Sequence, residues 1–377
     1  MSQFQIRKDD FSKQRLVPLD ADTASSPLAP GQIRLAVDSF SFTANNITYA
    51  AAGDMLGYWQ FYPPVGEDSA GWGVIPVWGF ANVIDSRCDQ ITAGERLFGY
   101  FPPATHVVMQ PTRITEHQLM EGSAHRAELP PAYNSYTRIP QGVGADQRAD
   151  KRAEAERMLL WPLHITSFCL WDALKDKQWH QAQQIIILSA SSKTSIGLAY
   201  ALANDPDAPP AVALTSSHNL PLVKQLEVYE QAMTYDELDQ INTSLPTVIV
   251  DMSGNSALLK RLAQRLGENL NYSIRVGLTH WAESQGDAGL DETKSEFFFV
   301  PSYIQKRMKD WGPQGFSERS ERFMHASAAW SRNWLKIRTV EGLSGLAEIY
   351  PAICQGKLAA DEGVVVAISG MNQNKAE

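Results

Sequence analysis

The first hundred residues of the chain carry short apolar segments that are typical of strands. From Gln32 to Ser39, polar residues alternate with Ile33, Leu35 and Val37, which is the period-2 pattern of a strand with one buried face. Further strands, or strand-and-turn units, are predicted at Gly73–Ile84, Thr92–Tyr100 and His106–Met109. Because Gly and Pro separate these short segments, we expect a barrel-like or sandwich-like module.

From Leu159 onward the pattern changes to strands that alternate with helices. Before it, Gln141–Arg157 predicts a surface insertion that leads into a helix. Apolar runs predict buried strands at Ile185–Leu188, Ala211–Thr215, Thr247–Asp251, Tyr272–Leu278 and Phe297–Val300. Helical spacing is found at Leu163–Leu174, Ser195–Ala203, Leu220–Tyr229 and Ala257–Leu266. This order predicts an α/β fold with a doubly wound parallel sheet.

The end of the chain is less regular. Beyond Pro301 it is polar and rich in tryptophan, and a helix at Glu341–Gln355 and a strand at Val364–Ile368 follow. The basic run Lys306–Lys309 has two interpretations, a group that binds an anion or a solvated helix face. The sequence alone leaves both open.

Composition and charge exclude several classes of protein. Acidic residues outnumber basic ones 42 to 33, which argues against nucleic-acid binding because a phosphate backbone needs a basic face. The cysteines, Cys88, Cys169 and Cys354, form neither a disulfide framework nor a zinc-finger pattern. We see no signal peptide and no apolar run of roughly 20 residues, so we expect a cytoplasmic protein that does not enter a membrane.

The most informative segment joins the first buried strand of the α/β part to its helix, from Ile185 to Gly197. At such a place the helix N-terminus binds phosphates, because its N–H groups are unpaired and carry partial positive charge. Dinucleotide-binding turns are rich in glycine. Here Gly197 is kept, and we expect it to let helix and strand pack closely. The predicted phosphate-binding residues are Ser191, Ser192, Lys193, Thr194 and Gly197, with Ser191 and Thr194 in place of glycines.

This turn has two other interpretations. It can be a packing solution between strand and helix without any ligand, and that interpretation stays open. A P-loop requires a glycine directly before the lysine and another five residues earlier. Ser192 and Ile187 occupy those positions, so a nucleoside triphosphatase is disfavoured.

The end of the second buried strand indicates which dinucleotide would bind. NAD-specific sites place an Asp or Glu there to hold the ribose 2′-hydroxyl. This chain has Leu214–Asn219 instead, and its first carboxylate afterwards is Glu227. Hydroxyl and amide donors tolerate a 2′-phosphate, which favours NADP(H) and assigns Ser216, Ser217 and Asn219 to it. Alternatively, these residues cap the next helix.

Several segments together carry a family resemblance. They are Ile75–Phe80, Ala93–Tyr100, His125–Arg126, Tyr133–Tyr136, Ser189–Thr194, Leu214–Ser216, Val276–Trp281 and Phe297–Pro301. With the order of a β-rich module, an α/β module and a return to the first, the chain resembles a bacterial and fungal branch of the medium-chain dehydrogenase/reductase superfamily. The resemblance implies a Rossmann-type dinucleotide-binding domain at 161–302. It also implies a β-rich GroES-like domain made of 1–160 and 303–377, completed by the C-terminal segment.

The resemblance also has implications for metal and substrate. Zinc-dependent members carry a Cys after the first strands and a Gly-His-Glu motif downstream. The corresponding stretch, Ser39–Asn46, has no Cys, and the chain has no Gly-His-Glu. The chain is therefore similar to the zinc-independent quinone and enone reductases, with no metal. In those members an Asn or Asp followed by a Tyr lines the nicotinamide pocket, which assigns that place to Asn46 and Tyr49.

Hydride transfer also needs a group that supplies a proton or polarises the substrate oxygen. Tyr49 is the first candidate, since the resemblance places it in the pocket. Tyr136 belongs to a polar and aromatic segment that we expect to be an active-site loop. His280 and the cofactor candidate Thr279 follow the predicted strand Tyr272–Leu278, at the end where open α/β sheets bind ligands, and the cofactor candidate Gly277 is near the end of that strand. Each residue also has a structural alternative. Tyr49 can serve packing, the segment of Tyr136 can be a loop held by its own hydrogen bonds, and His280 can cap the strand.

Three functional hypotheses follow. The first is a zinc-independent NADP(H)-dependent reductase of an enone or ketone, acting on a small apolar substrate. The second is an NADPH-binding sensor or scaffold without redox turnover, and the third is non-redox carbon–carbon cleavage in the same cleft. Relatives of this architecture often form homodimers through edge strands, and Phe297–Val300 is the candidate edge here.

Overall fold

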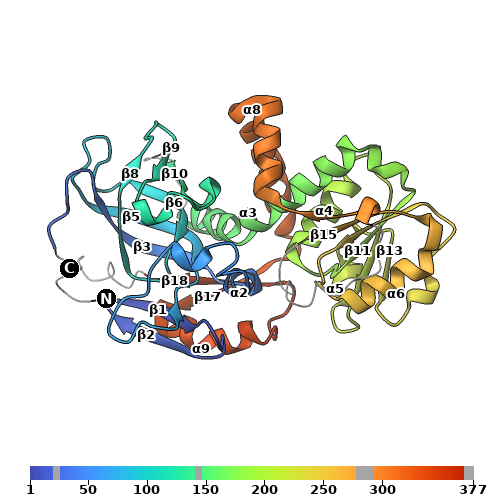
Figure 1. Ribbon diagram of the computed structural model, residues 1–377, viewed down its shortest axis with the longest axis horizontal. Coiled ribbons are helices and arrows are strands. Elements are labelled where there is room, and N and C mark those ends of the chain that lie inside the picture. The colour runs from blue at the N-terminus through green and yellow to red at the C-terminus, as the bar shows by residue number, and fades with distance from the viewer. Residues whose placement is uncertain (20–25, 141–146, 277–291, 369–377) are drawn as a thin grey trace. The chain divides into compact units, whose positions relative to one another are not determined.

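The chain folds into two units, which are described one at a time (Figure 1). The computed structural model describes residues 1–19, 26–140, 147–276 and 292–368. Unit 1 comprises Met1–Leu159 and Lys336–Glu377, and unit 2 comprises Leu160–Leu335. Residues 303–335, which the sequence assigned to the β-rich domain, thus belong to unit 2. The physical reason is that they form most of one long helix whose side chains bond to another helix of that unit.

Unit 1 contains two sheets in its described part. The larger has the strand order β17-β18-β3-β5-β6-β10-β9-β8, with β7 also paired to β3. Its strands are β3 (Ile33–Ser41), β5 (Val77–Ser86), β6 (Arg96–Phe101), β7 (His106–Met109), β8 (Pro111–Thr112), β9 (Gln118–Glu121), β10 (Ser135–Ile139), β17 (Lys336–Glu341) and β18 (Glu362–Ala367). The smaller has the order β2-β1-β4, with β1 (Ser2–Arg7), β2 (Gln14–Pro18) and β4 (Trp72–Gly73).

Strand β3 of the larger sheet buries the apolar positions that the sequence predicted. In β3, Ile33, Leu35 and Val37 are buried, as the period-2 pattern requires. Close packing at two glycines shapes this sheet. A Cβ at Gly79 would lie 2.4 Å from the carbonyl oxygen of Ser39, and one at Gly99 would lie 2.2 Å from the Tyr136 ring.

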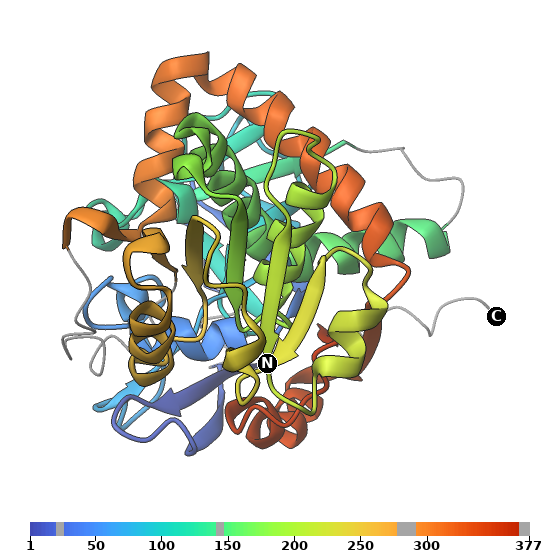
Figure 2. The same ribbon diagram turned by 90° about the vertical axis from the view of Figure 1, so that its right-hand side faces the viewer.

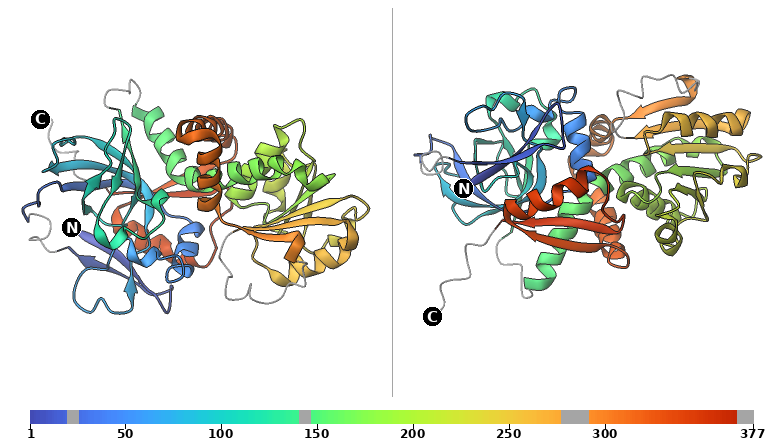
Figure 3. Two further views of the ribbon diagram at one scale, coloured as in Figure 1. Left: turned by 45° about the horizontal axis from the view of Figure 1, so that its top comes forward. Right: turned by 90° about the horizontal axis from the view of Figure 1, so that it is seen from below.

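The C-terminal segment completes this sheet, as Figure 3 shows in red. Strand β18 pairs antiparallel with β3 and parallel with β17. Segments from the N-terminal and the C-terminal parts of the sequence therefore share one sheet. Helix α9 (Gly342–Cys354) follows β17, and its Tyr350 packs against the rings of Phe4 and Phe42. Among the described residues of unit 1, the other α-helix that lies wholly within the unit is α2 (Ala44–Ala51).

Unit 2 is built on a six-stranded parallel sheet with the order β13-β12-β11-β14-β15-β16 (Figure 2). The strands are β11 (Gln184–Leu188), β12 (Ala211–Thr215), β13 (Gln231–Thr234), β14 (Thr247–Asp251), β15 (Leu270–Val276) and β16 (Ser295–Phe298). Numbered from first to last, this is the order 3-2-1-4-5-6 of a Rossmann-type sheet. The predicted fold class, a doubly wound sheet plus a β-rich domain, is confirmed.

Helices cover both faces of the parallel sheet. They are α4 (Lys193–Ala203), α5 (Leu220–Gln225), α6 (Ser256–Leu266), α8 (Val300–Ser331) and α3 (Gln147–Asp176), which crosses the boundary between the units. Ile185 and Ile187 pack in one core with Phe168 of α3, whereas Ile186 and Leu188 pack in another with the leucines of α6. Because both faces are buried, these strands are continuous apolar runs.

Short 3-10 turns connect these elements, at Tyr58–Gln60 (η1), Ala124–Arg126 (η2), Pro131–Tyr133 (η3), Gln178–Gln181 (η4), Leu238–Gln240 (η5), Gly267–Asn269 (η6) and Glu292–Lys294 (η7). Among the described residues, no helix combines the length and apolar character needed to cross a membrane.

Three expectations about elements need correction. The tryptophan-rich stretch after Pro301 is helical, because α8 continues to Ser331 through a kink at Gly312, whose φ is 75°. Strand β16 ends at Phe298, and Phe299 is already the N-cap of α8, so the predicted strand Phe297–Val300 is shifted. The segment Tyr133–Tyr136 is not a loop, since η3 ends at Tyr133 and β10 begins at Ser135.

Candidate functional site

The strand order of unit 2 reverses between β11 and β14, and open α/β sheets bind ligands at the carboxyl ends of the strands beside such a reversal. Three segments follow strands at this edge: the turn from Ser189 to Ser192 after β11, the residues from Ser216 to Asn219 after β12, and Met252 with its successors after β14. The cofactor-binding residues predicted after β11 and β12 therefore meet at one edge.

The turn after β11 is tight and leads directly into α4. Ser189 has a left-handed φ of 57°, and the N–H of Ser192 donates to the Ser189 carbonyl at 2.9 Å. Ser192 is the N-cap of α4, because its Oγ accepts from the N–H of Ser195 at 3.1 Å. The first intrahelical bond runs from Ile196 to Ser192, so the N–H groups of Lys193 and Thr194 precede it. They lie where a helix attracts anions.

Ser191 occupies the position of a glycine, and its side chain is hydrogen-bonded to β12 and to the segment that follows β12. Its Oγ accepts from Asn219 Nδ2 at 3.0 Å and from Thr215 Oγ1 at 3.3 Å, and the residue is only 7% exposed. Ser216 Oγ in turn accepts from the N–H of Asn219 at 3.4 Å, while Ser217 is exposed. The structure thus brings together Ser191 and Asn219, which the sequence predicted separately.

Ser192 also connects to the strand beyond the reversal. It donates to Ser195 Oγ at 2.8 Å, and Ser195 donates to the sulfur of Met252 at 3.1 Å. The preceding residue, Asp251, accepts from the N–H and hydroxyl of Ser253 at 2.8 and 2.7 Å, and its burial raises the pKa of its carboxyl. The sequence did not single out Met252, since a methionine after a buried strand carries no chemical signal.

Gly197 lies against helix α3 rather than against a strand. A Cβ there would be 2.6 Å from Ser167 Oγ and 2.8 Å from His164 Cδ2. Ser167 Oγ donates to the carbonyl oxygen of Thr194 at 2.7 Å, and His164 Nδ1 is hydrogen-bonded to Ser327 Oγ at 2.9 Å. The expectation of close packing holds, but its partner is a helix. His164 and Ser167 of α3 thus contact the first turns of α4, and the sequence did not predict this contact.

The segment after β15 holds the predicted residues Gly277, Thr279 and His280, which lie outside the described residues. Two of the three basic residues in the run Lys306–Lys309 on α8 pair with acidic residues. Lys306 bonds to Asp176 at 2.8 Å, and Arg307 bonds to Asp172, Asp176 and Asp310. These acids belong to the same unit, and Arg307 is the buried residue of the run, whereas Lys306 and Lys309 are exposed.

In unit 1 the predicted catalytic residues Asn46 and Tyr49 lie on α2. Asn46 Oδ1 accepts from the N–H of the N-cap residue Thr43 at 2.8 Å, and its Nδ2 donates to the carbonyl of Pro76 at 3.1 Å. The oxygen and the nitrogen of the Asn46 side chain thus both form hydrogen bonds that fix the first turn of α2. The phenol oxygen of Tyr49 accepts from Trp78 Nε1 at 3.3 Å, and the residue is 7% exposed.

The pKa of Tyr49 is raised. Burial is the main cause, and the neighbouring Tyr133 acts in the same direction, whereas hydrogen bonds from Trp78 and Asn45 lower it. The phenol is therefore protonated at neutral pH, while two donors face the oxygen that would carry negative charge after proton loss.

Tyr136 is fully buried in a hydrogen-bonded network of unit 1. Its hydroxyl donates to the Tyr100 carbonyl at 2.5 Å and accepts from Arg126 Nη2 at 3.2 Å. Arg126 lies 3.5 Å from Glu121 and bonds to Asn134 Oδ1 at 2.8 Å, so its charge is compensated. The ring of Tyr49 contacts those of Tyr58, Tyr100 and Tyr133. All three catalytic candidates within the described residues therefore belong to one polar and aromatic region.

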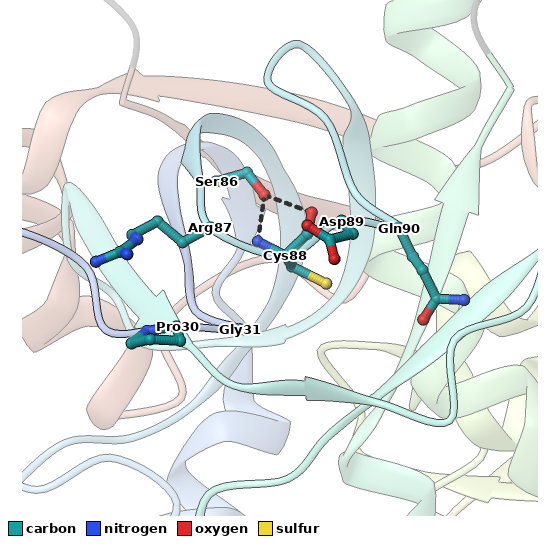
Figure 4. A pocket seen from close by; sticks show the side chains of 7 residues that line it. All are labelled: Pro30, Gly31, Ser86, Arg87, Cys88, Asp89 and Gln90. Carbon is teal, nitrogen blue, oxygen red and sulfur yellow. Dashed lines mark hydrogen bonds between the residues drawn. The ribbon is translucent and has the colours of Figure 1, made fainter.

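Unit 1 also has a surface hollow of about 810 Å³, drawn in Figure 4. Pro30, Gly31 and the residues from Ser86 to Gln90 line it. Its polar groups bond to one another and to backbone: Arg87 donates to the Leu28 carbonyl and Ser86 to that of Ile91. It contains none of the predicted site residues.

Comparisons with known proteins agree with this fold. The family model described as "Protein of unknown function (DUF2855)" matches residues 40–359. CurA from Vibrio vulnificus in complex with NADPH is similar, with 11% identity, a TM-score of 0.54 and coverage of 98% of this chain and 100% of that one. No curated protein sequence matches.

Two further solved structures are similar over nearly their whole length. A mutant form of enoyl thioester reductase from Candida tropicalis has 12% identity and a TM-score of 0.53, covering 98% of this chain and 100% of that one. JamJ enoyl reductase in its apo form has 12% identity and a TM-score of 0.56, covering 98% and 99%. At this identity the similarity shows the shared fold.

Proposed function

The chain belongs to the family described as "Protein of unknown function (DUF2855)", and we propose that it is an NADPH-dependent reductase of an enone or ketone. One observation carries this proposal: a strand order of 3-2-1-4-5-6 with a capped turn opening a helix at its reversal point. The structural neighbours named for enoyl reduction, and the one crystallised with NADPH, support it.

The residues at this edge fit a dinucleotide. The N–H groups of Lys193 and Thr194 would bind the pyrophosphate, and Ser216, Ser217 and Asn219 would bind the 2′-phosphate. Ser191 is larger than the glycine expected at this position, but its side chain is hydrogen-bonded to Thr215 and Asn219, on the side of β12. NADPH would supply the hydride. Gly277 and Thr279 keep their predicted role in cofactor binding.

Tyr49 would supply the proton in this proposal, with no metal. Its protonated phenol polarises the substrate oxygen or protonates the carbanion, and hydrogen bonds from Trp78 and Asn45 stabilise the phenolate that forms. Asn46 acts as a positioning residue, since it fixes the first turn of α2. His280 and Tyr136 remain catalytic candidates in this proposal, His280 at the nicotinamide or the substrate, and Tyr136 through a hydroxyl that is bonded to the Tyr100 carbonyl and to Arg126.

Binding and turnover test the proposal separately. Calorimetric titration with NADPH and NADH should show tighter binding of NADPH. Oxidation of NADPH at 340 nm, assayed with a panel of cyclic and acyclic enones and ketones, should then identify a substrate class. Absence of binding at millimolar NADPH would overturn the proposal. Tight binding without oxidation by any member of the panel would favour a sensor or scaffold instead.

A further inference from the structure

Ser191 links the two segments to which the proposed function assigns the cofactor phosphates. The turn after β11 would hold the pyrophosphate, and the segment after β12 would hold the 2′-phosphate. These segments are 28 residues apart at the bond between Ser191 and Asn219, and the Ser191 hydroxyl accepts hydrogen bonds from both Asn219 and Thr215. A glycine at this position could form neither bond.

The hydrogen bonds that Ser191 Oγ accepts from Asn219 and Thr215, called the bridge below, orient the side chain of Asn219. Its amide donates to Ser191 at 3.0 Å, while its backbone N–H donates to Ser216 Oγ at 3.4 Å. Asn219 is therefore bonded to both Ser191 and Ser216, so the amide of Asn219 and the hydroxyl of Ser216, both assigned to the 2′-phosphate, are held in one arrangement. Thr215 is 1% exposed, so this side of the bridge is fixed in the sheet.

The turn itself is joined to the same side of the unit by other bonds. The N–H of Ala190 donates to the Leu214 carbonyl at 3.1 Å, and the Tyr229 hydroxyl donates to the Ala190 carbonyl at 2.8 Å. These bonds fix the backbone of the turn without Ser191. Removal of the Ser191 hydroxyl therefore frees the side-chain amide of Asn219, while backbone bonds such as that from the N–H of Asn219 to the Ser216 carbonyl, at 3.1 Å, and those of Ala190 keep both backbones in place.

We propose that Ser191 is a positioning residue for cofactor selectivity: through Asn219 it orders the 2′-phosphate segment, so the preference for NADPH over NADH depends on its hydroxyl. The inference rests on the proposed function, because it concerns the same dinucleotide site. It gives a reason for a serine in place of the usual glycine.

The test is the affinity of Ser191→Ala and Ser191→Gly for both dinucleotides, measured by calorimetry. Each should lower NADPH affinity about tenfold, the equivalent of about 1.4 kcal/mol, and change NADH affinity less than about twofold. Ser191→Gly is the sharper variant, because it restores the glycine of an ordinary turn. Asn219→Ala should lower NADPH affinity as well, and adding Ser191→Ala to it should cost nothing further.

The matched control is Ser273→Ala, a buried serine in β15 whose hydroxyl has no hydrogen-bond partner among the described residues. It should leave both affinities unchanged, and thermal unfolding should show every variant folded. Equal losses for NADPH and NADH, or unchanged NADPH affinity in Ser191→Gly, would overturn the inference. Wild-type protein that binds neither dinucleotide would instead overturn the proposed function.

Discussion

At the scale of single residues, the proposed chemistry depends on one phenol. Tyr49→Phe removes the hydroxyl but keeps the ring that contacts Tyr58, Tyr100 and Tyr133. We expect kcat to fall about 100-fold or more, which is the usual contribution of a general acid. The KM for NADPH should not change. Steady-state kinetics with the substrate found in the panel measure both.

Tyr58→Phe is the control for that variant. It loses a hydrogen bond to Tyr133 at 2.8 Å close to Tyr49, and it should keep most of the activity. Because burial raises the pKa of Tyr49, the wild-type kcat should not fall at neutral or mildly alkaline pH through loss of this proton. Equal rates for Tyr49→Phe and wild type would contradict the assignment.

His164 gives a pH dependence of stability. Burial lowers its pKa to about 4 in the folded protein, below the value near 6.5 of an unfolded chain. Between these values the unfolded chain binds a proton that the folded one does not, so stability falls as pH drops from about 6.5 to about 4. The slope from this residue is about 1.4 kcal/mol per pH unit.

Urea unfolding at several pH values measures this slope, and His164→Gln should reduce it. An NMR titration of the imidazole provides the direct readout. A midpoint near pH 6.5 in the folded state would show that the ring is solvated, contrary to its position under the turn of α4.

At the scale of elements, α8 is held to α3 by a buried cation. The side chain of Arg307 is 7% exposed and lies 2.5 Å from Asp172 and 3.0 Å from Asp176. Arg307→Ala leaves the carboxylate of Asp172 without its charged partner, while the Tyr303 hydroxyl still donates to it at 2.6 Å. We therefore expect a loss of about 3 kcal/mol in the free energy of unfolding. Chemical denaturation followed by tryptophan fluorescence measures it.

The same helix provides the comparison for Arg307. Lys306 pairs with Asp176 at 2.8 Å, but its side chain is 47% exposed. Lys306→Ala should cost less than about 1 kcal/mol, as exposed pairs do. Similar losses for the two variants would mean that the position of Arg307 in the interface does not matter.

Which elements the sequence predicted depends on how they are buried. β12 and β14 match their predicted bounds because strands buried on both faces are continuous apolar runs. β13 was missed, since Met233 is its only fully buried residue. Helix α8 has no clear apolar stripe and is interrupted at Gly312, so its pattern resembled an irregular stretch.

The candidate site was predictable only in part, for a related reason. The turn at Ser191 and the absence of a carboxylate after β12 are local features of the sequence. The bonds from Ser191 to Asn219 and from Ser195 to Met252 join segments 28 and 57 residues apart, and only the parallel pairing of strands creates them. The hydrogen-bonded network around Arg126 and Tyr136 could not be predicted either. Tyr136 lies on β10, a strand with few apolar residues, so its pattern does not indicate a strand.

At the scale of the whole molecule, assembly is the open prediction. β16 is an edge of the parallel sheet, and within the described residues it pairs with β15 alone. An unpaired edge can accept the same strand of a second copy, with the two sheets joined across a twofold axis. Sedimentation at micromolar concentration should therefore show a dimer.

A charge on that edge tests where the contact lies. Phe297→Glu would place two carboxylates near each other across the twofold axis, so the variant should sediment as a monomer. Ile84→Glu is the control, because the Ile84 side chain is 48% exposed and belongs to unit 1, whereas β16 belongs to unit 2. It should remain a dimer. A monomeric wild type, or a Phe297→Glu variant that stays dimeric, would exclude pairing through β16.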